Sequence, residues 1–223
     1  MFCRVEASPA RYDGAMDRRK ILAVVRAAFG ILVLVAIAYQ AKTLIDGGFF
    51  RPLRYFAFFT ILSNLFGAVL YVVLAARWRA TRTRNFDLLR GAAVLYLVVT
   101  FVVVIALLSG AELQVGVPWV DFVVHKLFPL VVVIDWLIDP PATDLRLRDL
   151  GLWLIFPIVW VVLTLVRGAV DGWYPYPFLD PGNGGYRTVA YHIGVILAGF
   201  LVIGGVTIGL SDVLRERAAR RAG

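Results

Sequence analysis

The chain has few residues that bind metals or carry charge: one of its 223 residues is cysteine, two are histidine and only 17% are charged. A single cysteine, Cys3, excludes an intramolecular disulfide and a cysteine-based metal centre. Two histidines without an HExxH motif or a carboxylate-rich helix pair are too few for a catalytic zinc or di-iron site. Walker, GxSxG and Rossmann motifs are also absent, so the sequence predicts no metal and no cofactor.

Hydrophobic residues are correspondingly abundant. They make up 61% of the chain, and the mean hydropathy is +0.81. Soluble globular proteins contain only about 45–50% apolar residues, and disordered chains contain fewer still. A soluble fold of this length would leave much apolar surface in water, so the composition predicts a polytopic membrane protein.

Six apolar runs are long enough to cross a hydrocarbon core about 30 Å thick. They lack the alternation of barrel strands, and helices satisfy their own backbone groups in lipid, so we predict an all-α fold. The fifth run contains Pro157, which predicts a kink or an irregular end. The bundle occupies residues 21–210, with basic tails at 1–20 and 211–223. The six predicted spans are Ile21–Tyr39, Tyr55–Ala76, Leu88–Leu108, Trp119–Ile138, Leu150–Val166 and Val189–Leu210.

Positive charge is unevenly divided between the two sets of loops. With six spans, 16 basic residues fall on the side of the termini and five on the opposite side. The positive-inside rule therefore predicts that both termini are cytoplasmic, in a cell (inner or plasma) membrane. The net charge of +8 follows from this asymmetry. No nucleic-acid-binding motif accompanies it, so the predicted partners of the basic loops are anionic membrane lipids rather than nucleic acid.

Three polar side chains fall at a similar depth in the outer half of the predicted bundle. Thr60 lies five residues from the outer end of span two, about 7–8 Å deep at about 1.5 Å per residue. His125 in span four is about 9 Å deep, and His192 in span six is about 5 Å deep. Polar residues within a membrane are costly and mark sites by default, so we expect these three to share one outer layer.

Local spacing adds polar neighbours to two of them. Thr60, Ser63, Asn64 and Gly67 occupy positions i, i+3, i+4 and i+7, which puts them on one helix face. Lipid offers this face no hydrogen-bond partner, so it is expected to point into the bundle.

In span four, Asp121 lies four residues before His125, so its carboxylate is placed to orient the imidazole. Pro129 continues the same face and is expected to kink the helix one turn beyond His125. Lys126 points away from that face and is expected to snorkel towards the head groups. Asp135, near the inner end of the span, is expected to bind a basic loop residue or a backbone donor.

These residue types allow two interpretations. A threonine hydroxyl becomes a nucleophile when an imidazole removes its proton and a third group orients the base, which would make Thr60, His125 and Asp121 a catalytic set. Asn64 or a backbone amide near Pro129 would then supply an oxyanion donor. Alternatively, Thr60 caps or packs its helix and His125 is a satisfied interhelical hydrogen-bonding residue.

The outer loop 167–188 contains the segment WYPYPFL, which includes Trp173 and Tyr176. Prolines and aromatics at the end of a span are typical of an interfacial belt, but the same segment suits a lid over an outward-facing pocket. In the last span, Gly205 and Gly209 form a GxxxG motif, which is compatible with close packing in the bundle or with a homodimer.

Three stretches together resemble a known family. FFTILSNL (58–65), HKLFP (125–129) and WYPYPFL (173–179) are similar to segments of the bacterial six-span branch of the androgen-induced protein family, which includes the androgen-dependent regulator of tissue factor pathway inhibitor. The vertebrate members are membrane threonine hydrolases that cleave fatty acid esters of hydroxy fatty acids. The resemblance implies that Thr60 and His125 are the catalytic pair.

The leading hypothesis is therefore an integral membrane hydrolase of lipid esters that needs no cofactor. Its substrate would be an amphiphilic ester that reaches an apolar cavity from the outer leaflet. The alternative is a non-enzymatic protein that binds or carries lipids or small apolar molecules in the same pocket. The residues expected to support catalysis or to line the pocket are Ser63, Asn64, Asp121, Pro129, Trp173, Tyr176 and His192.

Overall fold

The structure is a computed structural model that describes residues 9–108 and 117–222, so Cys3 lies outside the described residues. Every regular element in these two ranges is helical, which confirms the predicted all-α class. The elements in chain order are α1 (Pro9–Asp46), α2 (Pro52–Tyr55), α3 (Phe59–Ala76), α4 (Arg84–Leu107), α5 (Pro118–Phe122), the π-helical turn η1 (Val123–Leu127), α6 (Phe128–Ile138), α7 (Asp149–Asp171), the 3-10 turns η2 (Pro177–Leu179) and η3 (Pro181–Asn183), and α8 (Gly185–Ala222).

In the described part of the chain, five helices are long and apolar enough to cross a membrane: α3, α4 and α7 over their whole length, residues Met16–Asp46 of α1 and residues Gly185–Arg217 of α8. The predicted fourth span, Trp119–Ile138, is helical but divided. Residues 118–138 form α5, η1 and α6, which follow one another directly. Pro129 is the reason for the division, because its missing N–H interrupts the regular hydrogen-bond ladder.

Several element boundaries differ from those predicted. Residues 55–58 do not belong to α3, because Tyr55 ends the short α2 and its hydroxyl donates a hydrogen bond to the carbonyl of Ile37 at 2.7 Å. The basic tails are helical extensions rather than separate segments, since α1 starts at Pro9 and α8 ends at Ala222. Helix α7 continues through Pro157. The irregular turn therefore lies at η1 in the fourth predicted span.

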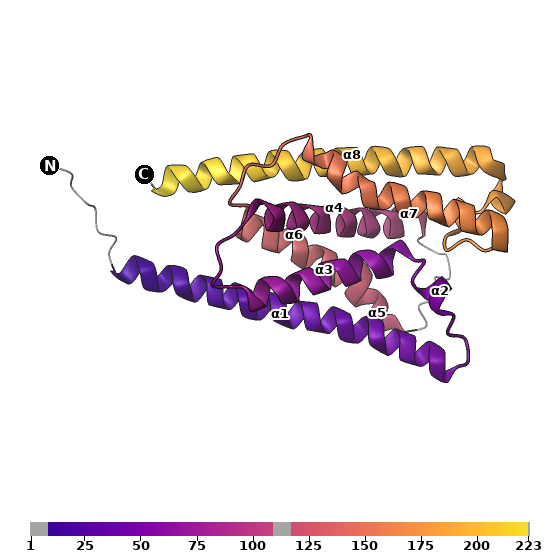
Figure 1. The fold of residues 1–223 in the computed structure, drawn as a ribbon, viewed down its shortest axis with the longest axis horizontal. Coiled ribbons are helices and arrows are strands. Elements are labelled where there is room, and N and C mark those ends of the chain that lie inside the picture. Colours follow the sequence, from indigo (N-terminus) through magenta and orange to yellow (C-terminus); the bar gives the residue numbers. More distant parts are fainter. Residues whose placement is uncertain (1–8, 109–116, 223) are drawn as a thin grey trace.

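Helix α4 occupies the centre of the bundle and contacts α3, α6, α7 and α8, while α1 packs along α3. The start of α1 and the end of α8 lie at the same end of the bundle, and α2 and α5 lie at the other end (Figure 1). Gly30 permits the close approach of α1 to α3, because a Cβ atom there would lie 2.8 Å from the carbonyl oxygen of Ala68.

The outer surface of the bundle carries large apolar side chains. Examples on three peripheral helices are Ile31, Val35, Leu163, Val166, Val202 and Val206, all exposed. Such a surface is stable in lipid and unstable in water. In α8, Gly204 faces Leu150, whereas a Cβ atom on Gly205 or Gly209 would meet no described atom within 4 Å. The GxxxG motif therefore makes no close helix contact within the described bundle.

A cluster of six charged residues lies at the end of the bundle that holds the start of α1. Asp135 of α6 accepts hydrogen bonds from Arg26 of α1 at 2.8 Å and from Arg90 of α4 at 2.9 Å. Asp139 binds Arg82 at 2.8 Å, and Arg82 and Arg90 lie 3.6 and 3.7 Å from Asp87. Asp135 thus binds two basic residues, but both lie within helices long enough to cross the membrane, not in a loop as was expected.

Candidate functional site

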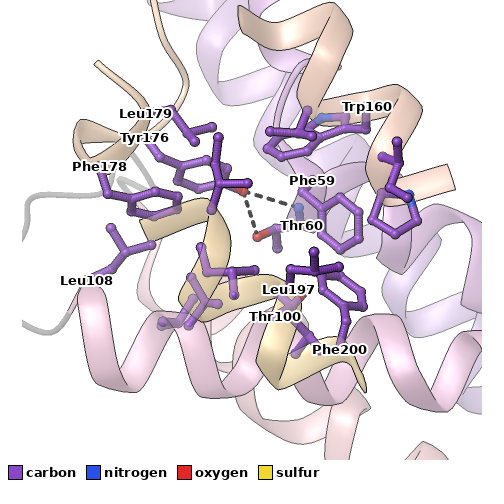
Figure 2. Close-up of a pocket in the computed structure, with 18 residues that line it drawn as sticks. Phe59, Thr60, Thr100, Leu108, Trp160, Tyr176, Phe178, Leu179, Leu197 and Phe200 are labelled. Atoms are coloured by element: carbon purple, nitrogen blue, oxygen red, sulfur yellow. Dashed lines mark hydrogen bonds between the residues drawn. The ribbon is translucent and has the colours of Figure 1, made fainter. Parts of the chain in front are cut away.

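Thr60 lies in the first turn of α3, at the end of the bundle opposite the charge cluster. Phe58 is extended (φ −70°, ψ 125°), so the chain enters the helix directly from the turn after α2. The Thr60 side chain is buried, and its Oγ1 lies 3.3 Å from the hydroxyl oxygen of Tyr176. The backbone N–H of Thr60 donates a hydrogen bond to the same oxygen, also at 3.3 Å (Figure 2). Two atoms of one residue thus contact the Tyr176 hydroxyl.

The polar face of α3 points into the bundle, as the spacing predicted. Ser63, Asn64 and Gly67 are all buried. The Ser63 hydroxyl donates to the carbonyl of Thr60 at 3.2 Å and lies 3.3 Å from the hydroxyl of Thr100. These contacts hold the first turn of α3 against α4.

The side-chain amide of Asn64 repairs the hydrogen-bond ladder of the neighbouring helix. In η1 the N–H of Phe128 donates to the carbonyl of Val123, five residues back. The same spacing would pair the carbonyl of Val124 with Pro129, which has no N–H. Asn64 Nδ2 donates to that carbonyl at 3.1 Å and to the carbonyl of Thr60 at 2.9 Å. The amide group has two hydrogens, and both are used.

Neither of the two oxyanion donors that the sequence suggested is free to bind a substrate. Asn64 has no N–H left for a substrate, because both are given to backbone carbonyls. Near Pro129, the N–H of Phe128 is given to Val123, and Pro129 itself has none. These groups stabilise the π-helical turn instead.

His125 lies in the π-helical turn and is buried, with its Nδ1 2.8 Å from Oδ1 of Asp121. This contact confirms the pairing predicted from their spacing of four residues. The Nδ1–H donates to the carboxylate, which leaves Nε2 as the nitrogen free to accept a proton. Lys126, the next residue, is exposed.

Two cavities meet at Thr60. The polar cavity, of about 290 Å³, is lined by Thr60 and His125 together with Gln40, Arg51, Arg54, Tyr55, Trp173, Tyr176 and several apolar residues. The apolar cavity, of about 120 Å³, is lined by Thr60 and Tyr176 and by aromatic and branched side chains that include Phe59, Val103, Trp160 and Phe200 (Figure 2). Thr60 and Tyr176 thus line both cavities.

Thr60 and His125 share the polar cavity without a direct hydrogen bond between them. Among the described residues, the hydrogen-bond partner of Thr60 Oγ1 is the hydroxyl of Tyr176. In an unliganded enzyme, catalytic hydrogen bonds are often long and tighten only with substrate. Direct proton transfer to His125 would therefore require the Thr60 hydroxyl to turn away from Tyr176.

His192 does not belong to this group, although it lies at a similar predicted depth. Its Nδ1–H donates to the carbonyl of Thr188 at 2.9 Å, and its ring packs against Phe178 with centroids 6.0 Å apart. Phe178 in turn stacks on Tyr176 at 5.1 Å. The two aromatic rings separate His192 from Thr60, and His192 lines neither of the two cavities.

The loop between α7 and α8 folds into the bundle. Tyr176 and Leu179 are buried, as a lid would require and an interfacial belt would not. Trp173 lines the polar cavity, and the guanidinium carbons of Arg54 and Arg167 lie 5.1 and 4.8 Å from its ring centroid. The aromatic loop therefore forms one wall of the site.

The sequence did not single out Arg51, Arg54 and Gln40 as cavity residues. The two arginines were counted only as charges of the loop before α3, although their place within a few residues of Thr60 was a usable signal. Gln40, near the end of the first apolar run, is buried and lines the polar cavity. Within residues 9–108 and 117–222, no group of three His, Cys, Asp or Glu side chains is placed to hold a metal ion.

Together these features define an all-helical protein of the membrane-spanning type, with a buried threonine and a histidine–aspartate pair that line one cavity. In comparisons with known proteins, no family model, no curated protein and no solved structure matches the chain. The family resemblance therefore depends on the three stretches of sequence that carry it.

Proposed function

We propose that the protein is an integral membrane hydrolase of lipid esters, with Thr60 as the nucleophile and His125 as the general base. The observation that carries the proposal is the position of Thr60. It lies where an apolar cavity meets a polar one, and the polar one is lined by a histidine whose other nitrogen is bound to Asp121. An ester of a long-chain acid has this division into apolar and polar parts.

The proposal includes six crossings and cytoplasmic termini. Residues 118–138 form a helical segment of 21 residues, which spans about 31 Å at about 1.5 Å per residue. This length supports a sixth crossing, since the hydrocarbon core is about 30 Å thick. The start of α1 and the end of α8 lie at the same end of the bundle, which supports an even number of crossings (Figure 1). The excess of Lys and Arg at that end supports a cytoplasmic location for both termini.

In the proposed reaction the acyl chain occupies the apolar cavity and the alcohol half occupies the polar cavity. Thr60 Oγ1 forms a bond to the ester carbon while its proton passes to Nε2 of His125, and the carbonyl oxygen takes the electron pair of the broken π bond. When the intermediate collapses, the alcohol leaves with the proton from His125. Water then attacks the acyl-Thr60 ester by the same route, which releases the fatty acid and restores Thr60.

The basic side chains in the polar cavity favour a substrate whose alcohol half carries a carboxylate. An ester of a hydroxy fatty acid is such a substrate. Arg51 and Arg54 line the cavity, and no described carboxylate lies within 4.0 Å of either one. Arginine is well suited to bind a carboxylate because its planar guanidinium group donates two parallel hydrogen bonds.

Turnover of a panel of long-chain esters by the purified protein tests the proposal, with p-nitrophenyl dodecanoate and esters of hydroxystearic acid in the panel. A fluorophosphonate probe should label the wild-type protein, and mass spectrometry should locate the label on Thr60. If no ester is hydrolysed and no label is incorporated, or if the label is on another residue, the proposal is wrong.

The second candidate function is non-enzymatic lipid binding in the same two cavities. The observation that favours it is the hydrogen bond of Thr60 to Tyr176 rather than to His125. A binding protein would retain a long-chain ester through purification and would return it intact, whereas a hydrolase would release the acid and the alcohol. Mass spectrometry of the ester after incubation distinguishes the two functions.

Asp121→Asn is expected to lower kcat by about 100-fold with little change in KM. The amide cannot stabilise the imidazolium that forms when His125 takes the proton, and its NH₂ group favours the wrong tautomer. The measurement is steady-state hydrolysis of p-nitrophenyl dodecanoate. Asp46→Asn is the matched control, because Asp46 also accepts from a residue four positions away, Lys42, on an exposed face. An equal effect of both substitutions would contradict the role of Asp121.

Arg54→Gln is expected to raise KM about 10-fold for esters that carry a free carboxylate and to leave KM for their methyl esters unchanged. The reason is the loss of a charged donor from the polar cavity. Arg187→Gln is the control, since Arg187 is exposed on α8 and lies outside both cavities. A parallel rise of KM for charged and neutral esters would show that Arg54 acts on cavity shape rather than on charge.

A further inference from the structure

The hydroxyl of Tyr176 lies beside the two atoms of Thr60 that matter most in an acyl transfer. It is 3.3 Å from the nucleophilic oxygen and 3.3 Å from the nitrogen of the same residue. Because the N–H of Thr60 points at the phenol oxygen, that oxygen now accepts the hydrogen bond of the amide. The phenol proton remains to be donated.

Three aromatic contacts fix the position of this hydroxyl. The Tyr176 ring stacks on Phe178 at 5.1 Å and packs edge-on against Phe58 at 5.6 Å and Trp160 at 6.0 Å. The neighbours of Tyr176 in the chain are Pro175 and Pro177, which restrict the backbone. A donor held in this way loses little conformational freedom when it binds a developing charge.

Burial raises the pKa of the Tyr176 phenol above its usual value near 10. The hydroxyl therefore keeps its proton at neutral pH and can act as a hydrogen-bond donor.

Three polar side chains of α3 and α4 close to Thr60 donate to backbone carbonyls. The hydroxyls of Ser63 and Thr100 donate to the backbone carbonyls of Thr60 and Tyr96. Asn64 gives both amide hydrogens to backbone carbonyls. Among the described side chains that form a hydrogen bond with Thr60, Tyr176 is thus the donor that is not committed to a backbone acceptor.

We propose that the Tyr176 hydroxyl and the backbone N–H of Thr60 form the oxyanion hole of the hydrolase. This inference rests on the proposed function. When Thr60 Oγ1 attacks the ester carbon, the carbonyl oxygen replaces the phenol oxygen as acceptor of the Thr60 N–H. The phenol turns its O–H to the same oxygen, so the negative charge that forms there has two donors. Both bonds strengthen as the charge develops, which lowers the barrier to attack.

Tyr176→Phe tests the inference, because it removes the donor and keeps the ring. With p-nitrophenyl dodecanoate we expect kcat to fall by about 10²–10³ while KM stays nearly constant, since the contact is made in the transition state. The rate of fluorophosphonate labelling should fall in parallel. Tyr96→Phe is the matched control: Tyr96 is also buried and also loses one hydrogen bond, to the carbonyl of Trp153.

Replacement of Tyr176 by fluorotyrosines of decreasing phenol pKa gives a readout that a purely structural role would not change. The hydroxyl remains but becomes a stronger donor, so log kcat should rise as the phenol pKa falls, down to the pH of the assay. This series also decides the matter if Tyr176→Phe fails to fold.

Each outcome supports or overturns the inference. If the wild-type protein hydrolyses esters but kcat of Tyr176→Phe stays within about threefold of it, or if log kcat is flat across the fluorotyrosine series, Tyr176 is not an oxyanion donor and the proposed function stands. If the wild-type protein is neither active nor labelled, the proposed function fails and this inference fails with it.

Discussion

Thr60→Ala is expected to lower kcat for ester hydrolysis by about 10⁴-fold or more and to abolish fluorophosphonate labelling. The substitution removes the atom that forms the acyl-enzyme bond. The folded protein should tolerate the change, because the lost contact with Tyr176 is a single neutral hydrogen bond at 3.3 Å, and such a bond contributes only about 1 kcal/mol. The measurement is turnover of p-nitrophenyl dodecanoate together with gel fluorescence of the labelled protein.

Two variants control for this result. Ser63→Ala removes a buried hydroxyl one turn further along the same face of α3 and should keep kcat within about threefold of the wild-type value. Thr60→Ser keeps the hydroxyl and should retain both labelling and turnover. Activity that survives Thr60→Ala, or that is lost equally in Ser63→Ala, would rule out Thr60 as the nucleophile.

The polar face of α3 and the pairing of His125 with Asp121 were predictable because both depend on the spacing of residues within one helix. Residues three, four and seven positions apart lie on one face whatever the rest of the fold does. The 2.8 Å contact of His125 with Asp121 follows from this rule, and it persists although the turn around His125 is π-helical.

The contact between Thr60 and Tyr176 was not predictable in this way. It joins residues 116 positions apart, and one of them lies in a loop that the sequence allowed to be either a belt or a lid. Depth alone was also insufficient for His192, because two residues at one depth can lie on opposite sides of an aromatic pair. Here the pair is Tyr176 and Phe178, with rings stacked at 5.1 Å.

The role of Asn64 was open to prediction from its neighbour. Pro129 removes a backbone donor in span four, so some carbonyl one turn earlier needs a partner from outside its own helix. A polar side chain on the adjacent helix at the same depth is the natural source. Asn64 meets that need at the carbonyl of Val124, which is why it does not serve the substrate.

The charge cluster at the opposite end of the bundle was partly visible in the sequence. Arg26 lies in the first predicted span and Asp135 in the fourth, each a few residues from the inner end, so the two share a depth. The structure joins them with two hydrogen bonds of 2.8 and 3.1 Å. The members of the cluster on α4 and in the loop after α3 were not predictable. Spacing along one helix does not determine how other parts of the chain approach it.

We expect this charge cluster to make a large contribution to the stability of the end of the bundle where it lies. Asp135, Arg26 and Arg90 are all buried, with exposed fractions of 8%, 8% and 2%. A buried charge that loses its partner costs far more than an exposed one, because the medium around it screens little. The cluster contains three arginines and three aspartates, and removal of one carboxylate leaves an excess positive charge inside the bundle.

Asp135→Asn is therefore expected to destabilise the protein by about 3–5 kcal/mol, which corresponds to a fall in Tm of roughly 10 °C for a chain of this size. The amide that replaces the carboxylate turns an NH₂ group towards Arg26 and Arg90. The measurement is thermal unfolding in detergent, followed by the loss of monodisperse protein on size exclusion. Asp144→Asn is the control, because Asp144 pairs with Arg146 and Arg215 on the exposed surface, and its loss should change Tm by no more than about 2 °C.

A double-mutant cycle with Arg26→Met separates the ion pair from other effects of the substitution. If Asp135 and Arg26 stabilise each other, the double variant is more stable than the sum of the two single effects predicts, because the unpaired charge is removed together with its partner. A coupling below about 0.5 kcal/mol, or equal Tm values for Asp135→Asn and Asp144→Asn, would contradict the assignment. Arg90 remains in the double variant, and it lies 3.7 Å from Asp87. This ion pair within α4 is therefore kept, and the cycle tests the contact between α1 and α6.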